Sequence, residues 1–415
     1  MERRTFLGTA AHATLGSYAG LPRFVTGAQE RAFQHLFPRA ERETFLNAAG
    51  GTPLATFAEA GITRYLDYIR YGPGEGRGEY RERAWAEVRG LFAGLIGARE
   101  SEIGLVESTK AGEQLLIEGL PALRRGGNIV TNDLHFSGSL HNLDGLRRAG
   151  MDVRIVRASP AFEVSLERMA DEIDDRTALV TVSLVSNVNG HIEPIAELAR
   201  VAHDRGAVVF ADVIQAAGAI PIDVHGMGID VAACSSYKWL FGIHGAGFLF
   251  VADRLQGTVL PDRLFPGHVR RTYVPWSEGG GAADAFAYTP PSTAQRYQPG
   301  HVNYLGYAAV YEGLRFLHDV GVPRVRAHSA ALVARLLDQI DQEAYGVLTP
   351  QPDQTPILSL RPWSVEGLRE LLASAQVTVS VGGDMDRLMR ISPAIFNTPA
   401  DIDRLAEVLE RHLRA

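Results

Sequence analysis

The sequence contains very little lysine and almost no cysteine. Only Lys110 and Lys238 of its 41 basic residues are lysines, and the other 39 are arginines. Its one cysteine, Cys234, falls inside a predicted buried strand, which excludes a disulfide framework or a cysteine-based metal site within one chain. No metal site is predicted.

Long apolar runs and clusters of basic residues are also missing. No run approaches the roughly 20 residues of a membrane-spanning helix, so no membrane span is expected. The formal net charge is −7, and without a basic patch nucleic acid is not an expected partner. Hydrophobic residues make up 46% of the 415 residues and charged residues 21%, which is typical of a globular protein with a substantial core.

The first 27 residues differ from the rest of the chain. Arg3 and Arg4 precede Phe6-Leu7 and a stretch of small residues of modest hydrophobicity. This pattern resembles a twin-arginine export signal, which would direct the protein to the periplasm. The alternative is a disordered basic tail on a cytoplasmic protein, because His12 interrupts the apolar stretch.

From Glu102 onward, short apolar runs alternate with helical patterns. The runs read IGLV, NIVT, VRIV, ALVTVS, AVVFA, VAACS and GFLFV. This alternation predicts an α/β fold, with a mostly parallel seven-stranded sheet flanked by helices. We expect a large domain over residues 45–300, preceded by an N-terminal segment over 28–44, and a smaller α+β domain over 301–415. Residues 262–300 are too long for an ordinary connection and predict a functional or interface loop.

Lys238 follows the strand VAACS at the point where open α/β folds bind ligands. Arginine provides nearly all of the positive charge of this chain, so a lysine at this position suggests a role that arginine cannot fill. Arginine cannot lose its proton in a protein, whereas a desolvated lysine can attack a carbonyl carbon. The alternative is a surface lysine that happens to follow a strand.

Polar residues follow three other predicted strands. Ser108, Thr109 and Lys110 open a helix, where hydroxyls and backbone N–H groups can bind phosphate; the alternative is a simple helix cap. Asp212 directly follows AVVFA, and a carboxylate buried there needs a cationic partner. Asn187 lies in a turn after ALVTVS. The alternatives for these two residues are a capping Asp and a plain Asn-rich turn.

The order Ser-Thr loop, Ser-Asn-x-x-Gly, Ala-Asp-x-x-Gln and Ser-x-x-Lys resembles the class V aminotransferase superfamily of fold-type I pyridoxal phosphate (PLP) enzymes. The chain looks most like the branch of isopenicillin N epimerase and cysteine desulfurase. The segments Arg390-Ile391-Ser392-Pro393 and Asn397-Thr398 resemble the C-terminal signature of that branch. The likeness runs from about residue 45 to the end of the chain.

The resemblance implies a role for each motif residue. Lys238 would be the Schiff-base lysine and the acid–base that moves the substrate's α-proton. The cofactor contacts would come from Ser108, Thr109, Lys110, Phe136, Asn187, Asp212, Gln215, Ser235, Tyr237 and His301. Within this set, Asp212 would pair with the pyridine nitrogen and Gln215 with the phenolic oxygen. Arg390 and Asn187 would bind the α-carboxylate of the substrate.

Four positions depart from the family pattern. Tyr237 stands where histidine is common. His301 stands where threonine is common, in a segment that resembles the one that donates a phosphate contact across the dimer. The residue expected to stack on the cofactor is Phe136, with His135 one register away. Desulfurases carry a nucleophilic cysteine on a loop of the small domain, and this sequence has none there, so desulfuration through a persulfide is not expected.

The resemblance implies a PLP-dependent enzyme that acts on an α-amino acid or a derivative. Amino transfer or epimerisation is the first expectation. A cysteine-independent C–S or β-elimination lyase is the alternative, and a PLP-dependent oxidase is another. A catalytically silent PLP-fold binding protein is the non-enzymatic alternative, although a relic would be expected to lose one of the motif residues. A homodimer with both sites at the interface is also implied.

Overall fold

The computed structural model describes residues 33–262, 270–271, 288–289, 291–382 and 388–414. The predicted signal over residues 1–27 and most of the predicted loop over 262–300 lie outside these residues. Within the described segments, the helices are too short or too polar to traverse a lipid bilayer.

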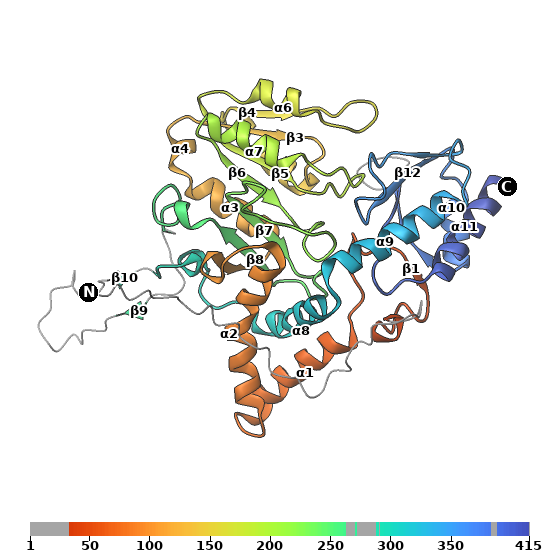
Figure 1. The fold of residues 1–415 in the computed structure, drawn as a ribbon, viewed down its shortest axis with the longest axis horizontal. Helices are drawn as coiled ribbons and strands as arrows, with labels where there is room; N and C mark the ends of the chain where they lie inside the picture. The colour runs from red at the N-terminus through yellow and green to blue at the C-terminus, as the bar shows by residue number, and fades with distance from the viewer. Residues whose placement is uncertain (1–32, 263–269, 272–287, 290, 383–387, 415) are drawn as a thin grey trace, which may run out of the picture.

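A seven-stranded sheet forms the centre of the larger part of the molecule (Figure 1). Its strand order is β2-β8-β7-β6-β5-β3-β4, and β8 alone runs against its neighbours. The strands are β2 (Ile103–Val106), β3 (Asn128–Asn132), β4 (Val153–Val156), β5 (Thr177–Ser183), β6 (Val208–Asp212), β7 (Val231–Ser235) and β8 (Gly247–Val251). Each overlaps one of the seven predicted runs, with β6 shifted by one residue relative to AVVFA, so the predicted fold class is confirmed.

Helices cover this sheet, which explains why its strands are continuous apolar runs. Every residue of β2, β3, β5, β6, β7 and β8 is buried. The helices of this part are α1 (Thr56–Tyr71), α2 (Arg77–Ile96), α3 (Thr109–Gly119), α4 (Pro121–Arg124), α5 (Ser137–Arg148), α6 (Leu166–Glu172), α7 (Ile195–Asp204) and α8 (Tyr304–Val320).

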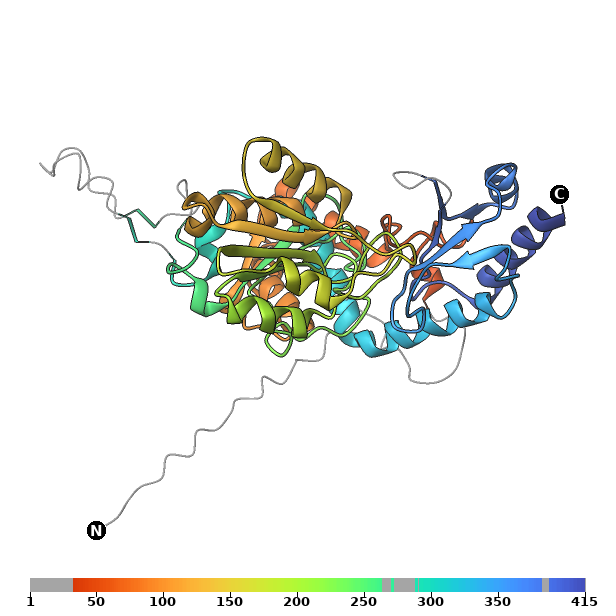
Figure 2. The same cartoon turned by 90° about the horizontal axis from the view of Figure 1, so that it is seen from above.

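A second, smaller layer contains the C-terminal residues. Its four-stranded antiparallel sheet has the order β11-β12-β15-β14, and a two-stranded sheet pairs β1 with β13 in parallel. Figure 2 shows this layer, in blue, beside the larger part, with the cyan helices leading from one to the other. The elements are β1 (Thr44–Phe45), α9 (Val322–Leu337), β11 (Tyr345–Val347), β12 (Leu358–Pro362), α10 (Leu368–Ser374), β13 (Val377–Thr378), β14 (Ser380–Val381), β15 (Met389–Ile391) and α11 (Pro399–Arg414). Two further strands, β9 (Arg270–Arg271) and β10 (Tyr288–Thr289), pair with each other.

The two layers have separate hydrophobic cores. The first core includes residues of α8 and of the start of α9, such as Val325. Within α9, the residues that belong to the second core start at Leu332. Leu46, which follows β1, belongs to the second core. The domain boundaries expected from the sequence stay predictions, while the cores show that α9 is shared between the layers.

Helix α3 packs unusually close to the sheet because Gly112 faces β7. A Cβ atom at this position would lie 2.7 Å from Cβ of Ala233 and 3.2 Å from Cδ1 of Leu249. Such contacts require that a neighbour shift, so glycine is needed at this position. The close approach brings the first turn of α3 to the end of β7, where Ser235 lies.

Candidate active site

The predicted site residues gather at the carboxyl end of the sheet, where the parallel strands end. Asp212 is the last residue of β6, Ser235 is the last residue of β7, and Lys238 follows three residues later. Thr109 begins α3 just after β2. Because β2, β6 and β7 run in the same direction, their ends carry these side chains to one edge.

Lys238 is buried, with 7% of its surface exposed. Burial lowers the pKa of its amine to about 8, the charge of Asp212 opposes this shift, and Arg390 adds to it. Its Nζ lies 5.7 Å from the ring centroid of Tyr237 and makes no hydrogen bond within the described segments. A lysine in this state provides a neutral, nucleophilic amine near physiological pH.

Asp212 is the carboxylate whose charge has the largest effect on the pKa of Lys238. Burial raises its pKa, while His135, the backbone N–H of Ile214 and the charge of Lys238 oppose the rise, in that order. Its Oδ1 accepts a hydrogen bond of 2.9 Å from Ile214 N. One buried oxygen bond leaves capacity for a cationic N–H partner, which agrees with the predicted pairing to a pyridine nitrogen.

The first turn of α3 and the end of β7 form a hydroxyl cluster. Thr109 N donates to Ser235 Oγ over 2.8 Å, and Ser235 N donates to Thr109 Oγ1 over 2.9 Å. Ser108 caps the helix by accepting from Ala111 N. The side chain of Lys110 donates from Nζ to the carbonyl of Gly138 over 2.6 Å, so its charge is held at the start of α5. The Lys110 cation, the hydroxyls of Thr109 and Ser235 and the N-terminus of α3 together suit a phosphate group.

Gln215 is held by two neighbours at the same edge. Its Nε2 donates to the carbonyl of Ala49 over 3.0 Å, and its Oε1 accepts from Trp239 Nε1 over 2.9 Å. These bonds fix the amide and leave its second N–H for another partner. The predicted contact with a phenolic oxygen stays a prediction.

Arg390 reaches the site from β15 of the small layer. Its Nη1 donates to the carbonyl of Asn187 over 2.8 Å, and its Nη2 lies 3.5 Å from Oδ1 of Asn47. Arg390 Nε and Asn187 Oδ1 are both buried and have no hydrogen-bond partner in the described part of the chain. Burial also lowers the pKa of Arg390. Unsatisfied buried polar atoms are costly. A substrate carboxylate would accept from Arg390 Nε, and an N–H or O–H donor of the substrate or cofactor would satisfy Asn187 Oδ1.

The two residues considered for stacking on the cofactor occupy different environments. His135 is 1% exposed, and both of its ring nitrogens contact protein groups. Phe136 is half-buried and precedes α5. Phe136 is therefore the residue with an aromatic face available to a ligand, as the family resemblance implies. The stacking on the cofactor stays a prediction.

Tyr237 and His301 lie toward the surface of the site. The Tyr237 ring stacks on His244, with ring centroids 4.0 Å apart and an interplanar angle of 31°. His301 is exposed and its Nδ1 lies 3.0 Å from the hydroxyl of Tyr304. The structure therefore does not bring His301 into the buried group around Lys238, which is compatible with the predicted contact across a dimer.

Two residues of the site region were missed by sequence reasoning. Glu113 lies beneath the hydroxyl cluster and is 2% exposed. It falls on the buried stripe of α3 formed with Thr109, Gly112 and Leu116, so a charged residue at an apolar position was the available signal. Asn47 lies in a glycine-rich loop, and nothing local marks its approach to Arg390.

The sequence profile of the family "Aminotransferase class-V" matches residues 73–405. A probable cysteine desulfurase of Methanothermobacter thermautotrophicus is 28% identical over 328 residues, which cover 75% of this chain and 78% of the relative. An uncharacterised aminotransferase of Bacillus subtilis, YcbU, is 25% identical and covers 89% and 94%, respectively.

Solved structures show the same fold. The cysteine desulfurase CsdA of Escherichia coli superposes with a TM-score of 0.82 at 19% identity, covering 94% of this chain and 99% of that chain. The cystine C–S lyase C-DES, in complex with cysteine persulfide, gives a TM-score of 0.76 at 19% identity, covering 90% and 98%. Another C-DES structure, a mutant with glycine covalently linked to its PLP cofactor, gives 0.77 at 20% identity, covering 91% and 98%.

The fold, with its mostly parallel sheet flanked by helices, is therefore that of the fold-type I PLP enzymes. The family match extends over most of the chain and includes the strand ends that carry Asp212 and Lys238. The chain belongs to the class V aminotransferase family, whose cofactor is pyridoxal phosphate.

Proposed function

We propose that this protein is a PLP-dependent enzyme that acts on an α-amino acid or a derivative through Lys238, by amino transfer or epimerisation. The observation that carries the proposal is the state of Lys238. Its pKa is lowered to about 8 by burial, and the charges of Asp212 and Arg390 act on it from two sides. A surface lysine after a strand would have none of these properties.

The residues present suit the cofactor. When bound, PLP would supply an electron sink that acidifies the α-carbon of an amino acid. Asp212 would hold the proton on the pyridine nitrogen, and the buried position of its carboxylate fits a cationic ring. Thr109, Lys110 and Ser235 would bind the phosphate with Ser108, and Gln215 and Asn187 would lie near the phenolic oxygen. Phe136 would stack on the ring, with Tyr237 and, across a dimer, His301 completing the contacts.

Lys238 and Arg390 would act on different groups of the substrate, the α-proton and the α-carboxylate, respectively. Lys238 Nζ would hold the cofactor covalently and then accept the α-proton, since its neutral amine is a base near pH 8. The α-carboxylate would lie against the unpartnered Nε of Arg390, where a guanidinium binds it in two-point geometry. Asn187, whose Oδ1 is also unpartnered, would orient the amino acid.

A cysteine-independent C–S lyase is the second candidate. Solved structures of the cystine C–S lyase C-DES share this fold, and several relatives are named cysteine desulfurases. The 415 residues contain one cysteine, Cys234, which is 0% exposed on β7 and whose pKa burial raises well above the ordinary value. A persulfide route through a mobile cysteine of this chain is therefore not supported, whereas an elimination that uses Lys238 as its only base is.

The visible spectrum of protein purified with PLP tests the proposal. We expect a visible band from lysine-bound cofactor in the wild type, its loss in Lys238→Ala, and its retention with weaker cofactor binding in Lys110→Ala. The chain's only other lysine thus serves as the matched control. Absence of the band in PLP-supplied wild type would contradict the proposal.

A panel of L-amino acids separates the reaction types. Amino transfer converts the cofactor to its amine form and releases a keto acid. Epimerisation keeps the band and exchanges the α-proton for solvent deuterium. Elimination from cystine or cysteine conjugates releases pyruvate and ammonia.

We also propose a homodimer. Ile69 and Tyr71 on α1 are 61% and 63% exposed, which is unusual for such residues unless a surface covers them. Light scattering of the purified protein tests this, with a monomeric mass as the contrary result. Export by a twin-arginine signal is a separate proposal, tested by fusing residues 1–27 to a reporter that is active only outside the cytoplasm.

A further inference from the structure

A closed polar network lies beneath the predicted cofactor site. It consists of Glu113, His135, Ser139, Thr181 and Ser183, which are between 0% and 7% exposed. None of these residues belongs to the predicted cofactor or substrate contacts. Burying an ionisable pair such as Glu113 and His135 costs desolvation free energy. A functional role at this place would explain why the pair is present.

Glu113 and His135 form the centre of the network. His135 Nε2 lies 3.0 Å from Glu113 Oε1, which also accepts from the Thr181 hydroxyl over 2.9 Å. The Ser139 hydroxyl donates to Glu113 Oε2. Burial alone would raise the pKa of Glu113, but His135 and the two hydroxyls lower it to about 2. Glu113 is therefore an ionised acceptor, and Nε2 of His135 is the donor.

The other side of His135 faces the strand next to Asp212. His135 Nδ1 lies 2.8 Å from the hydroxyl of Ser183. Ser183 on β5 is the direct cross-strand partner of Asp212 on β6, and Leu184 N donates to the carbonyl of Asp212 over 2.9 Å. One residue therefore separates His135 from the strand position that holds the carboxylate.

The network also joins the elements that carry the other predicted cofactor contacts. Glu113 is on α3, whose first turn contains Thr109 and Lys110. His135 precedes Phe136, and Ser139 lies in the first turn of α5, where Gly138 accepts from Lys110. A shift of the pair would move the phosphate site, the stacking ring and the neighbour of Asp212 together.

We propose that Glu113 and His135 are positioning residues that hold the α3, α5 and β5 ends in register and thereby fix Asp212 against the cofactor ring. The proposal rests on the proposed function, since it concerns the same site. Glu113 binds His135 at Nε2, and His135 Nδ1 contacts the hydroxyl of Ser183, the cross-strand partner of Asp212. Glu113 and His135 act through Asp212 and need not touch the cofactor.

His135 and the carboxylates around it also influence Asp212 through charge. Glu113 from α3, Asp212 from β6 and Glu193 from the segment after β5 face it. His135 is the largest of the influences that lower the pKa of Asp212, ahead of the backbone bond and of Lys238. The charge of Glu113 opposes it more weakly. The net effect of the pair on Asp212 therefore depends on His135.

The same sheet offers a matched control pair. His225 Nε2 lies 2.9 Å from Oε2 of Glu102, a carboxylate that is 0% exposed. Glu102 precedes β2 at the opposite end of the sheet. His225→Gln therefore removes an imidazole from a buried carboxylate without approaching the site.

The test compares His135→Gln with His225→Gln in protein loaded with PLP that is ¹⁵N-labelled at the ring nitrogen. The ¹⁵N chemical shift reports whether the ring nitrogen carries a proton, independently of turnover. We expect the protonated position in the wild type and in His225→Gln, and a shift toward the unprotonated position in His135→Gln. The dissociation constant for PLP should rise about tenfold in His135→Gln, the equivalent of one charged hydrogen bond.

Glu113→Gln tests the link between the two residues. A glutamine replaces the carboxylate that holds His135 at Nε2, so the same ¹⁵N shift is expected, and the double variant should add little to either single variant. Ser183→Ala leaves only a small cavity and should give a partial shift. It keeps the test decisive if the larger changes prevent folding.

The outcomes separate this inference from the proposed function. Wild-type protein that binds no PLP at Lys238 would overturn the proposed function. If wild type binds PLP but all three site variants keep the wild-type ¹⁵N position and lose only thermal stability, as His225→Gln does, the pair is structural and the inference is wrong.

Discussion

At the carboxyl end of the central sheet, some buried polar atoms have no hydrogen-bond partner within the described segments, whereas at the amino end buried carboxylates are paired several times over. Asn187 Oδ1 and Arg390 Nε represent the first situation. Asp230 represents the second: its carboxylate is 1% exposed, Oδ2 lies 2.8 Å from His203 Nε2 and accepts from Val209 N, and Oδ1 contacts Arg254. Both ends are buried, so burial alone does not explain the difference.

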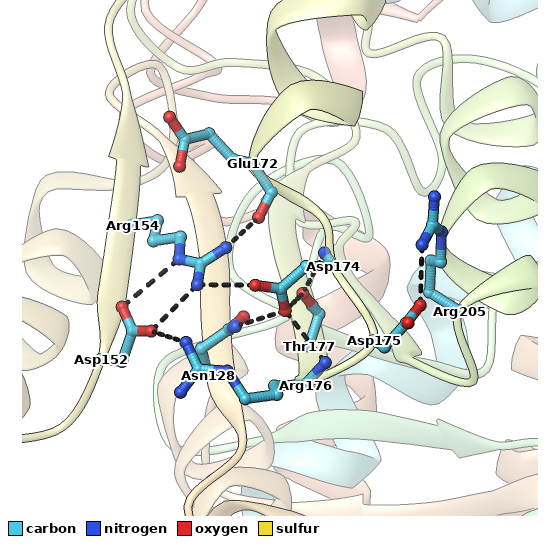
Figure 3. A network of polar contacts seen from close by, with 9 residues as sticks. All are labelled: Asn128, Asp152, Arg154, Glu172, Asp174, Asp175, Arg176, Thr177 and Arg205. Carbon is cyan, nitrogen blue, oxygen red and sulfur yellow. Dashed lines mark hydrogen bonds and ion pairs between the residues drawn. The ribbon is translucent and has the colours of Figure 1, made fainter.

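Figure 3 shows a second part of the amino end, where β3, β4 and β5 begin. Arg154 donates to Asp152, Asp174 and the carbonyl of Glu172 over 2.7–3.0 Å. Asn128 Nδ2 donates to Asp174 Oδ1 over 2.9 Å, while Asn128 Oδ1 is buried without a hydrogen-bond partner among the described residues. The side chains of Asp152 and Asp174 are 40% and 42% exposed. Beside β6–β8, a hollow of about 540 Å³ is lined by the similarly paired Glu102 and Asp230. The comparison teaches that unsatisfied polar atoms indicate a site where they lie near a buried ionisable side chain such as Lys238, and that volume, charge or a single unsatisfied atom is insufficient.

Asp230→Asn should have the largest effect and should act on stability alone. The change removes the charge from a buried side chain that binds His203, Arg254 and the backbone N–H of Val209, so we expect a loss of about 3 kcal/mol in the free energy of unfolding. Urea denaturation measures it. Turnover of the protein that remains folded should match the wild type. A loss below about 1 kcal/mol would break the comparison, because the amino end would then not be held by its charges.

Asp212→Asn should have the opposite profile. The asparagine keeps the shape but cannot stabilise a protonated ring, so kcat should fall by about 10²- to 10³-fold. Burial raises the pKa of Asp212, and a neutral amide in its place should leave the free energy of unfolding of the apoprotein unchanged or higher. The same denaturation experiment and an assay with the best amino acid of the panel measure both quantities. A destabilised but active variant would place Asp212 with the structural carboxylates.

The sequence alone predicted the carboxyl end well, because its chemistry follows strand ends that are visible in one dimension. Continuous apolar runs predict strands covered on both faces. Asp212 is the last residue of one such strand, and Lys238 lies three residues beyond the end of another. Contacts between distant segments carried no such pattern. Arg390 reaches the carbonyl of Asn187 across 203 positions of sequence, and the Asp230 cluster joins α7, β6 and the segment after β8.

Glu113 shows which contacts could not be predicted from the sequence. Its burial could have been suspected from the helical stripe, but its partners His135, Ser139 and Thr181 come from three other elements. Each partner is an ordinary residue at its own position. Long-range register decides which of them meet, and that register depends on the packing of α3 at Gly112.

Arg390→Lys should have a smaller effect, concentrated in substrate binding. A lysine keeps the charge but loses the planar fork that binds a carboxylate at two points. We expect KM for the amino acid to rise about 10- to 100-fold, the equivalent of one charge-assisted hydrogen bond, with kcat reduced less. Arg254→Lys at the amino end is the matched control and should leave KM unchanged. An unchanged KM in Arg390→Lys would remove this residue from the substrate site.

The smallest effect concerns pH, and it depends on the lowered pKa of Lys238. Only the neutral amine attacks a carbonyl, and burial lowers the pKa of this amine to about 8. The rate at which apoprotein captures PLP, followed by the growth of the visible band, should therefore rise about tenfold per pH unit below 8 and level off above it. A free lysine derivative treated in the same way reports the titrations of PLP itself and provides the correction.

Asp212→Asn sharpens this last measurement, because the charge of Asp212 raises the pKa of Lys238 against the effect of burial. Removing that charge should move the midpoint of the capture rate to lower pH, while Asp230→Asn should leave it in place. If both variants keep the wild-type midpoint, burial alone determines the state of the lysine, and the carboxyl end does not act as one electrostatic unit. If the midpoint moves only in Asp212→Asn, the unpaired groups at this end influence one another as the structure indicates.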